Sequence, residues 1–188
     1  MSGWKTNSHS HYNKGPDILS LSAAIMCPCS SDVPGHPMDP PYPVEALLPQ
    51  SQAMILLDRV VEAGENHILV ELTVRDDGLF SGPDRTVPAW VGLEYMAQAI
   101  AAFSGHHRKR RGEEIGLGFL LGTRYYQCSA GSFPCGLRLR VRAEKVIEAA
   151  NEMSVFDCAL EGGGIRAASK LNVLLPKDAK KFLAGKGI

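Results

Sequence analysis

The sequence has no excess charge of either sign and no apolar run long enough to span a membrane. Twenty basic residues balance twenty acidic residues, so the formal net charge is zero. A neutral chain has no overall attraction to nucleic acid or to a membrane surface. The apolar run at 18–26 is shorter than a bilayer requires, and Asp17 before it and Met26 at its end do not fit a signal peptide. We therefore expect a cytoplasmic protein without nucleic-acid binding or membrane insertion.

Cysteine is scarce and lacks the spacing of a disulfide framework or of a metal site. The five cysteines are an odd number in a chain of 188 residues, which is long enough to fold without disulfides. Cys27 and Cys29, with His36 nearby, lie closer together than a usual zinc-binding pair and lack a matched second pair. We predict reduced thiols and no metal site.

Length and local composition predict one domain with two tails. Apolar residues make up 45% of the chain, which is enough for a hydrophobic core. Residues 1–43 are punctuated by Ser, Asn, His, Gly and Pro, which is typical of a disordered tail, and Met38 is a candidate alternative start. The regular pattern occupies 44–176. For the lysine-rich tail, 177–188, we expect a short surface helix.

The hydrophobic pattern of 44–176 predicts an α+β fold in which an antiparallel sheet wraps around one long helix. The helix is expected at 90–110, where the residues are apolar on nearly every face, so we predict burial all round. The last three strands are expected to form an antiparallel meander. Besides a short helix at 44–48, we predict strands at 54–62, 67–75, 115–128, 136–149, 153–160 and 165–175.

Two strongly polar residues interrupt the apolar helix one turn apart, Glu94 and Gln98. Burial raises the pKa of a carboxyl group, and a raised pKa suits a general acid near neutral pH. The alternative is structural: Glu94 complements the helix dipole, and Gln98 bonds a neighbouring strand. A catalytic role predicts that Gln98→Leu lowers activity more than stability.

Gly92, in the first turn, leaves room for a close approach by another backbone, by a ligand such as a thioester, or simply by packing neighbours.

Three segments carry a resemblance to a known family: LLPQ at 47–50, MILLDRV at 54–60 and PAWVGLEYMAQA at 88–99. Together they resemble the hotdog-fold 3-hydroxyacyl-[acyl-carrier-protein] dehydratases. More narrowly, 87–102, 115–124 and 126–128 resemble the dehydratase-like hotdog proteins of aryl-polyene gene clusters.

The resemblance implies a dimer with active sites at the subunit interface and no cofactor. A histidine from the loop before the helix of one subunit takes the C2 proton of a 3-hydroxyacyl thioester, and a helix carboxyl of the other subunit protonates the departing hydroxyl. Glu94 matches that acid and Gln98 the glutamine one turn later. The substrate-binding end matches the helix start, and we expect Phe80, Pro88, Val91 and Gly92 to line it.

The expected histidine is missing. It lies 14 positions before the acid in the family, which is Phe80 here, or Leu79 if one residue is inserted. We favour a dehydratase that takes its base from a partner hotdog subunit, in a heterodimer rather than a homodimer. The alternatives are a hotdog acyl-thioesterase, in which Glu94 activates water, and a non-catalytic partner of an active dehydratase. The substrate is expected on an acidic acyl carrier protein, for which 106–111 and the arginines at 138, 140 and 142 are basic candidate surfaces.

Overall fold

The structure is a computed structural model and describes residues 42–50, 52–77, 79–176 and 182. The predicted tail at 1–43, apart from its last two residues, lies outside the described residues, as do Cys27, Cys29 and His36. The same holds for the predicted C-terminal helix, apart from Phe182. The three described cysteines, at 128, 135 and 158, are free.

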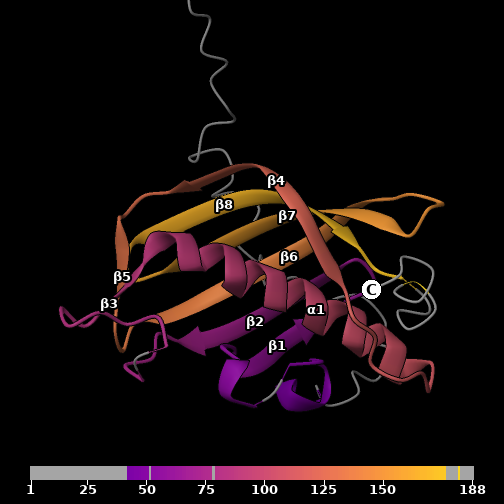
Figure 1. Cartoon of the computed structure of the whole chain (residues 1–188), viewed down its shortest axis with the longest axis horizontal. Coiled ribbons are helices and arrows are strands. Elements are labelled where there is room, and N and C mark those ends of the chain that lie inside the picture. Colours follow the sequence, from indigo (N-terminus) through magenta and orange to yellow (C-terminus); the bar gives the residue numbers. More distant parts are fainter. Residues whose placement is uncertain (1–41, 51, 78, 177–181, 183–188) are drawn as a thin grey trace, which may run out of the picture. The chain divides into compact units, whose positions relative to one another are not determined.

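The described chain forms a six-stranded antiparallel sheet in the order β1-β2-β6-β7-β8-β4, with one long helix, α1, across one face (Figure 1). The predicted meander of the last three strands is confirmed. The strands are β1 (Arg59–Ala63), β2 (His67–Thr73), β4 (Phe119–Cys128), β6 (Arg138–Glu148), β7 (Met153–Gly162) and β8 (Ile165–Leu174).

A second sheet has two strands, β3 (Thr86–Pro88) and β5 (Ser132–Pro134), paired antiparallel. The sequence pattern missed both strands because three residues are too few to show an alternation of apolar and polar side chains. β3 runs directly into a 3-10 turn, η4 (Ala89–Val91), and then into α1 (Gly92–Arg110). The small sheet therefore anchors the start of the long helix.

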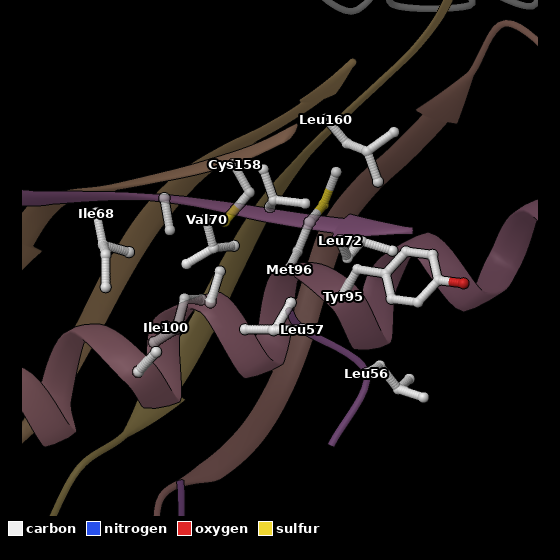
Figure 2. Packing of buried hydrophobic residues seen from close by; sticks show 14 of the residues in the cluster. Leu56, Leu57, Ile68, Val70, Leu72, Tyr95, Met96, Ile100, Cys158 and Leu160 are labelled. Carbon is white, nitrogen blue, oxygen red and sulfur yellow. The ribbon is translucent and has the colours of Figure 1, made fainter. Parts of the chain in front are cut away.

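The apolar core lies between α1 and the face of the large sheet that it covers. Met96 and Ile100 of the helix pack among strand residues that include Val70, Leu72 and Leu160 (Figure 2). Full burial of one such side chain stabilises a fold by about 1.5–3 kcal/mol. The position of α1 is thus fixed by packing along most of its length.

The helix is not buried all round, which corrects the sequence prediction. Glu94, Ala97, Ala101 and Ser104 are half-buried and recur at helical spacing, so they form one partly exposed face. The sheet covers the opposite side of the helix. Alanine is tolerated on an exposed helical face because it has the highest helix propensity. The apolar pattern counted these alanines as buried residues, and the prediction of burial on every face was therefore wrong.

Several predicted elements are shorter than expected. Instead of a strand from residue 54, the chain forms a 3-10 turn, η3 (Gln52–Met54), and pairs as β1 only from Arg59. The reason is that the Leu56 amide donates to the Gln98 side chain of α1 rather than to a neighbouring strand. The predicted helix at 44–48 is a 3-10 turn, η2 (Val44–Ala46). Among the described helices, none is long and apolar enough to cross a membrane.

A half-buried histidine at the C-terminal end of α1 predicts loss of stability in acid. Burial lowers the pKa of His107, and His106, Lys145 and Arg111 lower it further. Below the unfolded value of about 6.5, the unfolded chain then binds the proton more tightly than the folded chain. Stability therefore falls as the pH drops through this window.

We expect the free energy of unfolding, measured with urea, to fall between about pH 7.5 and about pH 5.5. In His107→Gln this fall should be smaller. His67→Gln is the matched control, because His67 is also half-buried but is paired with the carboxyl group of Glu62 at 2.8 Å. An equal fall in the parent and in His107→Gln would contradict the prediction.

Candidate active site

Glu94 lies in the first turn of α1, on the partly exposed face of the helix. Its Oε1 atom accepts a hydrogen bond of 3.0 Å from Nε2 of Gln98, one turn later. The positive end of the helix dipole is nearest to this turn and stabilises a negative charge there. The structure therefore brings together the polar pair that the spacing predicts, with the carboxyl group half-buried rather than enclosed.

Gln98 is buried, with 1% of its surface exposed, and both the oxygen and the nitrogen of its side-chain amide form hydrogen bonds. Oε1 accepts from the Leu56 amide at 2.9 Å, and Nε2 donates to the Met54 carbonyl at 2.8 Å as well as to Glu94. The side chain thus ties the segment before β1 to the helix. The contacts fit both the structural and the catalytic interpretation of Gln98, because its side chain bonds a neighbouring segment and also the carboxyl group of Glu94.

This arrangement changes the expected effect of Gln98→Leu. The leucine leaves the buried amide of Leu56 without a partner, which costs about 1–3 kcal/mol, and it also removes the hydrogen bond to the carbonyl of Met54. We therefore expect both stability and activity to fall, with a clear decrease in the free energy of unfolding in urea. Gln127→Leu is the matched control, because Gln127 is half-buried on β4 and makes no side-chain hydrogen bond within the described chain. Unchanged stability of Gln98→Leu would contradict the prediction.

Gly92 is explained by a side chain that lies directly over it. A Cβ atom at this position would come within 2.3 Å of the hydroxyl oxygen of Tyr126, on β4. That hydroxyl donates a hydrogen bond to the carbonyl of Ala89, in the turn before α1. The close approach expected at Gly92 is therefore made by Tyr126. Sequence reasoning missed Tyr126. The glycine in the first turn of the helix was the one feature that indicated a close neighbour at this place.

Phe80 lies beside the start of α1. Its ring contacts that of Trp90 edge to face, with the centroids 6.0 Å apart. Phe80 also shares a small depression with Leu56, Val87 and Tyr95. Trp90 itself is 60% exposed, the largest value among the big apolar side chains of the described residues. The position where the family carries its base is thus occupied by an aromatic pair.

The other predicted substrate-binding residues lie at the same end of the helix. Pro88 is half-buried and pairs with Ser132 across the small sheet. Val91 is fully buried in the core, so neither its side chain nor its backbone is exposed.

No histidine of the described chain lies near Glu94. His67 is at the start of β2 and bonds Glu62, while His106 and His107 lie near the opposite end of α1. In the described residues no cluster of three or more His, Cys, Asp or Glu side chains is arranged to hold a metal ion. Of the predicted acid and the histidine base of the resembling family, the described residues place only Glu94 here.

A cavity of about 1020 Å³ lies at the far end of α1. It is lined by Ser104 and by residues of the last helical turns, and Ser104 is about 15 Å along the helix axis from Glu94. Charged residues in its wall pair with one another, such as Lys145 with Glu148 at 2.5 Å and Arg111 with Glu113 at 2.6 Å. We base the candidate site on Glu94 rather than on this cavity, because Glu94 is the carboxyl group that matches the acid of the resembling family, and it does not line the cavity.

Comparisons with known proteins agree with the geometry. In a search of solved structures, a chain of the dehydratase heterocomplex ApeI:P from Xenorhabdus doucetiae matches with a TM-score of 0.68 and 31% identity, over 76% of this chain and 96% of that chain. An uncharacterized protein, PH1136 from Pyrococcus horikoshii, matches with a TM-score of 0.52 and 13% identity, over 72% and 95%, and shows the fold alone. No curated protein sequence matches significantly. The predicted α+β hotdog fold is confirmed.

The family comparison covers the helix, the polar pair and all strands of the sheet. The model of the ApeP-like family, described as ApeP dehydratase, matches residues 42–184. With a match of this length and the similarity to the ApeI:P complex, the chain belongs to the ApeP-like dehydratase family.

Proposed function

We propose that this chain is a subunit of a 3-hydroxyacyl-[acyl-carrier-protein] dehydratase of aryl-polyene biosynthesis, with Glu94 as the general acid and the base supplied by a partner subunit. The observation that carries the proposal is a carboxyl group at the start of α1 that is half-buried, held by Gln98 and without a histidine beside it in the described residues. The dehydratase domain is residues 44–176, flanked by tails at 1–43 and 177–188.

The reaction removes a proton from C2 and a hydroxyl from C3 of the acyl thioester, and a C2–C3 double bond forms as water leaves. A base takes the C2 proton, and protonated Glu94 gives its proton to the departing hydroxyl. Gln98 bonds Oε1 of Glu94, which leaves Oε2 for the substrate. The positive end of the α1 dipole stabilises the carboxylate that remains after the transfer.

The base comes from a second hotdog chain. Support for this assignment comes from the position of Phe80 beside the helix start and from the placement of His67, His106 and His107 elsewhere. The similar ApeI:P structure is a heterocomplex by its description. We assign this chain to the same kind of assembly, a heterodimer with a dehydratase that has the histidine.

The free edge of the sheet supports assembly with another chain. β4 is the last strand of the sheet order, so one side of its backbone has no neighbour in the described sheet. Leu120 and Leu121 on β4, and Leu117 just before it, are each close to half exposed. An edge strand with exposed leucines is suited to pairing with a strand of a partner.

The substrate is carried by an acyl carrier protein, and the arginines of β6 favour an acidic carrier. Arg138 and Arg140, with Arg59 of β1, surround the single carboxylate of Glu71 and keep their outer surfaces exposed. Burial by itself would raise the pKa of Glu71, but hydrogen bonds from Arg59 and Arg140 and the charge of Arg138 lower it below its usual value. Three cations against one anion leave positive charge on this face of the sheet.

The test is an assay of the chain, with and without its partner dehydratase, on a 3-hydroxyacyl thioester. We expect a 2,3-unsaturated thioester from the mixture and no hydrolysis of the thioester. Hydrolysis by the chain alone would instead indicate a thioesterase. Binding to the partner without any Glu94-dependent product would indicate a non-catalytic subunit.

A further inference from the structure

Tyr126 and Gly92 meet at one carbonyl group, that of Ala89 in the turn before α1. The tyrosine hydroxyl donates to the Ala89 oxygen, and the Gly92 amide donates to the same oxygen as it closes the turn. Two donors from distant parts of the chain thus converge on one acceptor. Burial raises the pKa of the Tyr126 hydroxyl, so it stays a protonated donor at neutral pH.

The same turn is held from its other side by the connection between β4 and β5. The Ala89 amide donates to the carbonyl of Gly131 at 3.0 Å. Directly before Ala89, Pro88 pairs with Ser132 and Val87 with Phe133. Both polar groups of Ala89 are therefore bonded to the segment that follows from Tyr126, and the turn has little freedom to move without breaking a bond.

The hydroxyl group of Tyr126 fits only beside a glycine at position 92. A Cβ atom on Gly92 would lie 2.3 Å from the hydroxyl oxygen but 3.3 Å from the ring carbon that carries it. The first distance is a collision, and the second is a tight contact that small shifts can relieve. The hydroxyl that clamps the turn is thus the atom that requires a glycine at 92.

We propose that Tyr126 is a positioning residue for Glu94: its hydroxyl, admitted by Gly92, fixes the turn at Ala89 and with it the first turn of α1, which carries the acid. The inference rests on the proposed function for the role of Glu94. The clamp itself stands on the contacts of Tyr126, Ala89 and Gly92.

The clamp is tested first without any assay of activity. Trp90 lies in the clamped turn, and Trp4→Phe leaves it as the sole tryptophan. In that background Tyr126→Phe should lower the fluorescence anisotropy of Trp90, because the turn gains mobility. Tyr125→Phe is the matched control, since this neighbouring hydroxyl makes no hydrogen bond within the described residues, and it should leave the anisotropy unchanged. Unchanged anisotropy in Tyr126→Phe would overturn the clamp.

Kinetics in the mixed assembly then test positioning. Because displacement of a reacting group by about 1 Å costs up to about 10²-fold, we expect Tyr126→Phe to lower kcat by about tenfold or more. KM should change little, and Tyr125→Phe should change neither constant. A change confined to KM, or a fall in kcat in proportion to the fraction of unfolded protein, would overturn a positioning role.

Combining the two positions gives the sharpest outcome. Gly92→Ala should lower kcat and the melting temperature strongly when Tyr126 is present, and less when the residue at 126 is phenylalanine, because the colliding oxygen is gone. Additive effects would overturn the pairing of Gly92 with Tyr126.

If Glu94→Gln retains full activity, the proposed function fails while the anisotropy result stands. If Glu94→Gln is inactive and Tyr126→Phe is fully active, the positioning inference alone fails.

Discussion

Glu94→Gln should lower dehydration by about 10²-fold or more, which is the contribution expected of a general acid. The amide has nearly the shape of the carboxyl group but has no acidic proton to give to the departing hydroxyl. Its oxygen can still accept the hydrogen bond from Gln98, so the helix and the segment before β1 should stay in place. The measurement is kcat of the assembly with its partner, beside the melting temperature of each variant.

Glu45→Gln is the matched control for this variant. Glu45 is an exposed acid in the turn η2 and has no ion pair or side-chain hydrogen bond in the described part of the chain. It should change neither activity nor stability. If Glu94→Gln dehydrates as fast as the parent, Glu94 serves only to complement the helix dipole, and the proposed mechanism fails.

The fold was predictable because its elements are long. The helix predicted at 90–110 is η4 followed by α1, and the last three strands pair as the predicted meander. Periodicity is visible when a segment is long enough to show several repeats. β3 and β5 have three residues each, and nothing in such short segments distinguishes a strand from a loop.

The site was predictable in its local part only. Glu94 and Gln98 meet because helical spacing places them on one face. The partners of Gln98 at Met54 and Leu56 lie more than forty residues away, and only the packing of the segment before β1 against α1 brings them there. Tyr126 is 37 residues from Ala89 in the chain, and a strand tyrosine by itself does not indicate a clamp.

The absence of a histidine at Phe80 has the largest consequence for activity. A homodimer of this chain would contain Glu94 in both sites and Phe80 where both bases belong, so neither site would be complete. In a heterodimer with a histidine-containing dehydratase, the partner's base would face Glu94 in one site. The other site would combine Phe80 with the partner's acid and would remain inactive.

Complementation between two inactive proteins is the expected result. This chain alone should be nearly inactive, and so should a partner dehydratase whose own helix acid is replaced by its amide. Mixed together, the two should regain dehydration, because the partner's histidine and Glu94 complete one site per heterodimer. A mixture with Glu94→Gln should fall by about 10²-fold or more, as for the loss of a general acid. Full activity of this chain alone would overturn the scheme, because it would require a base within the homodimer, and no histidine of the described residues lies near Glu94.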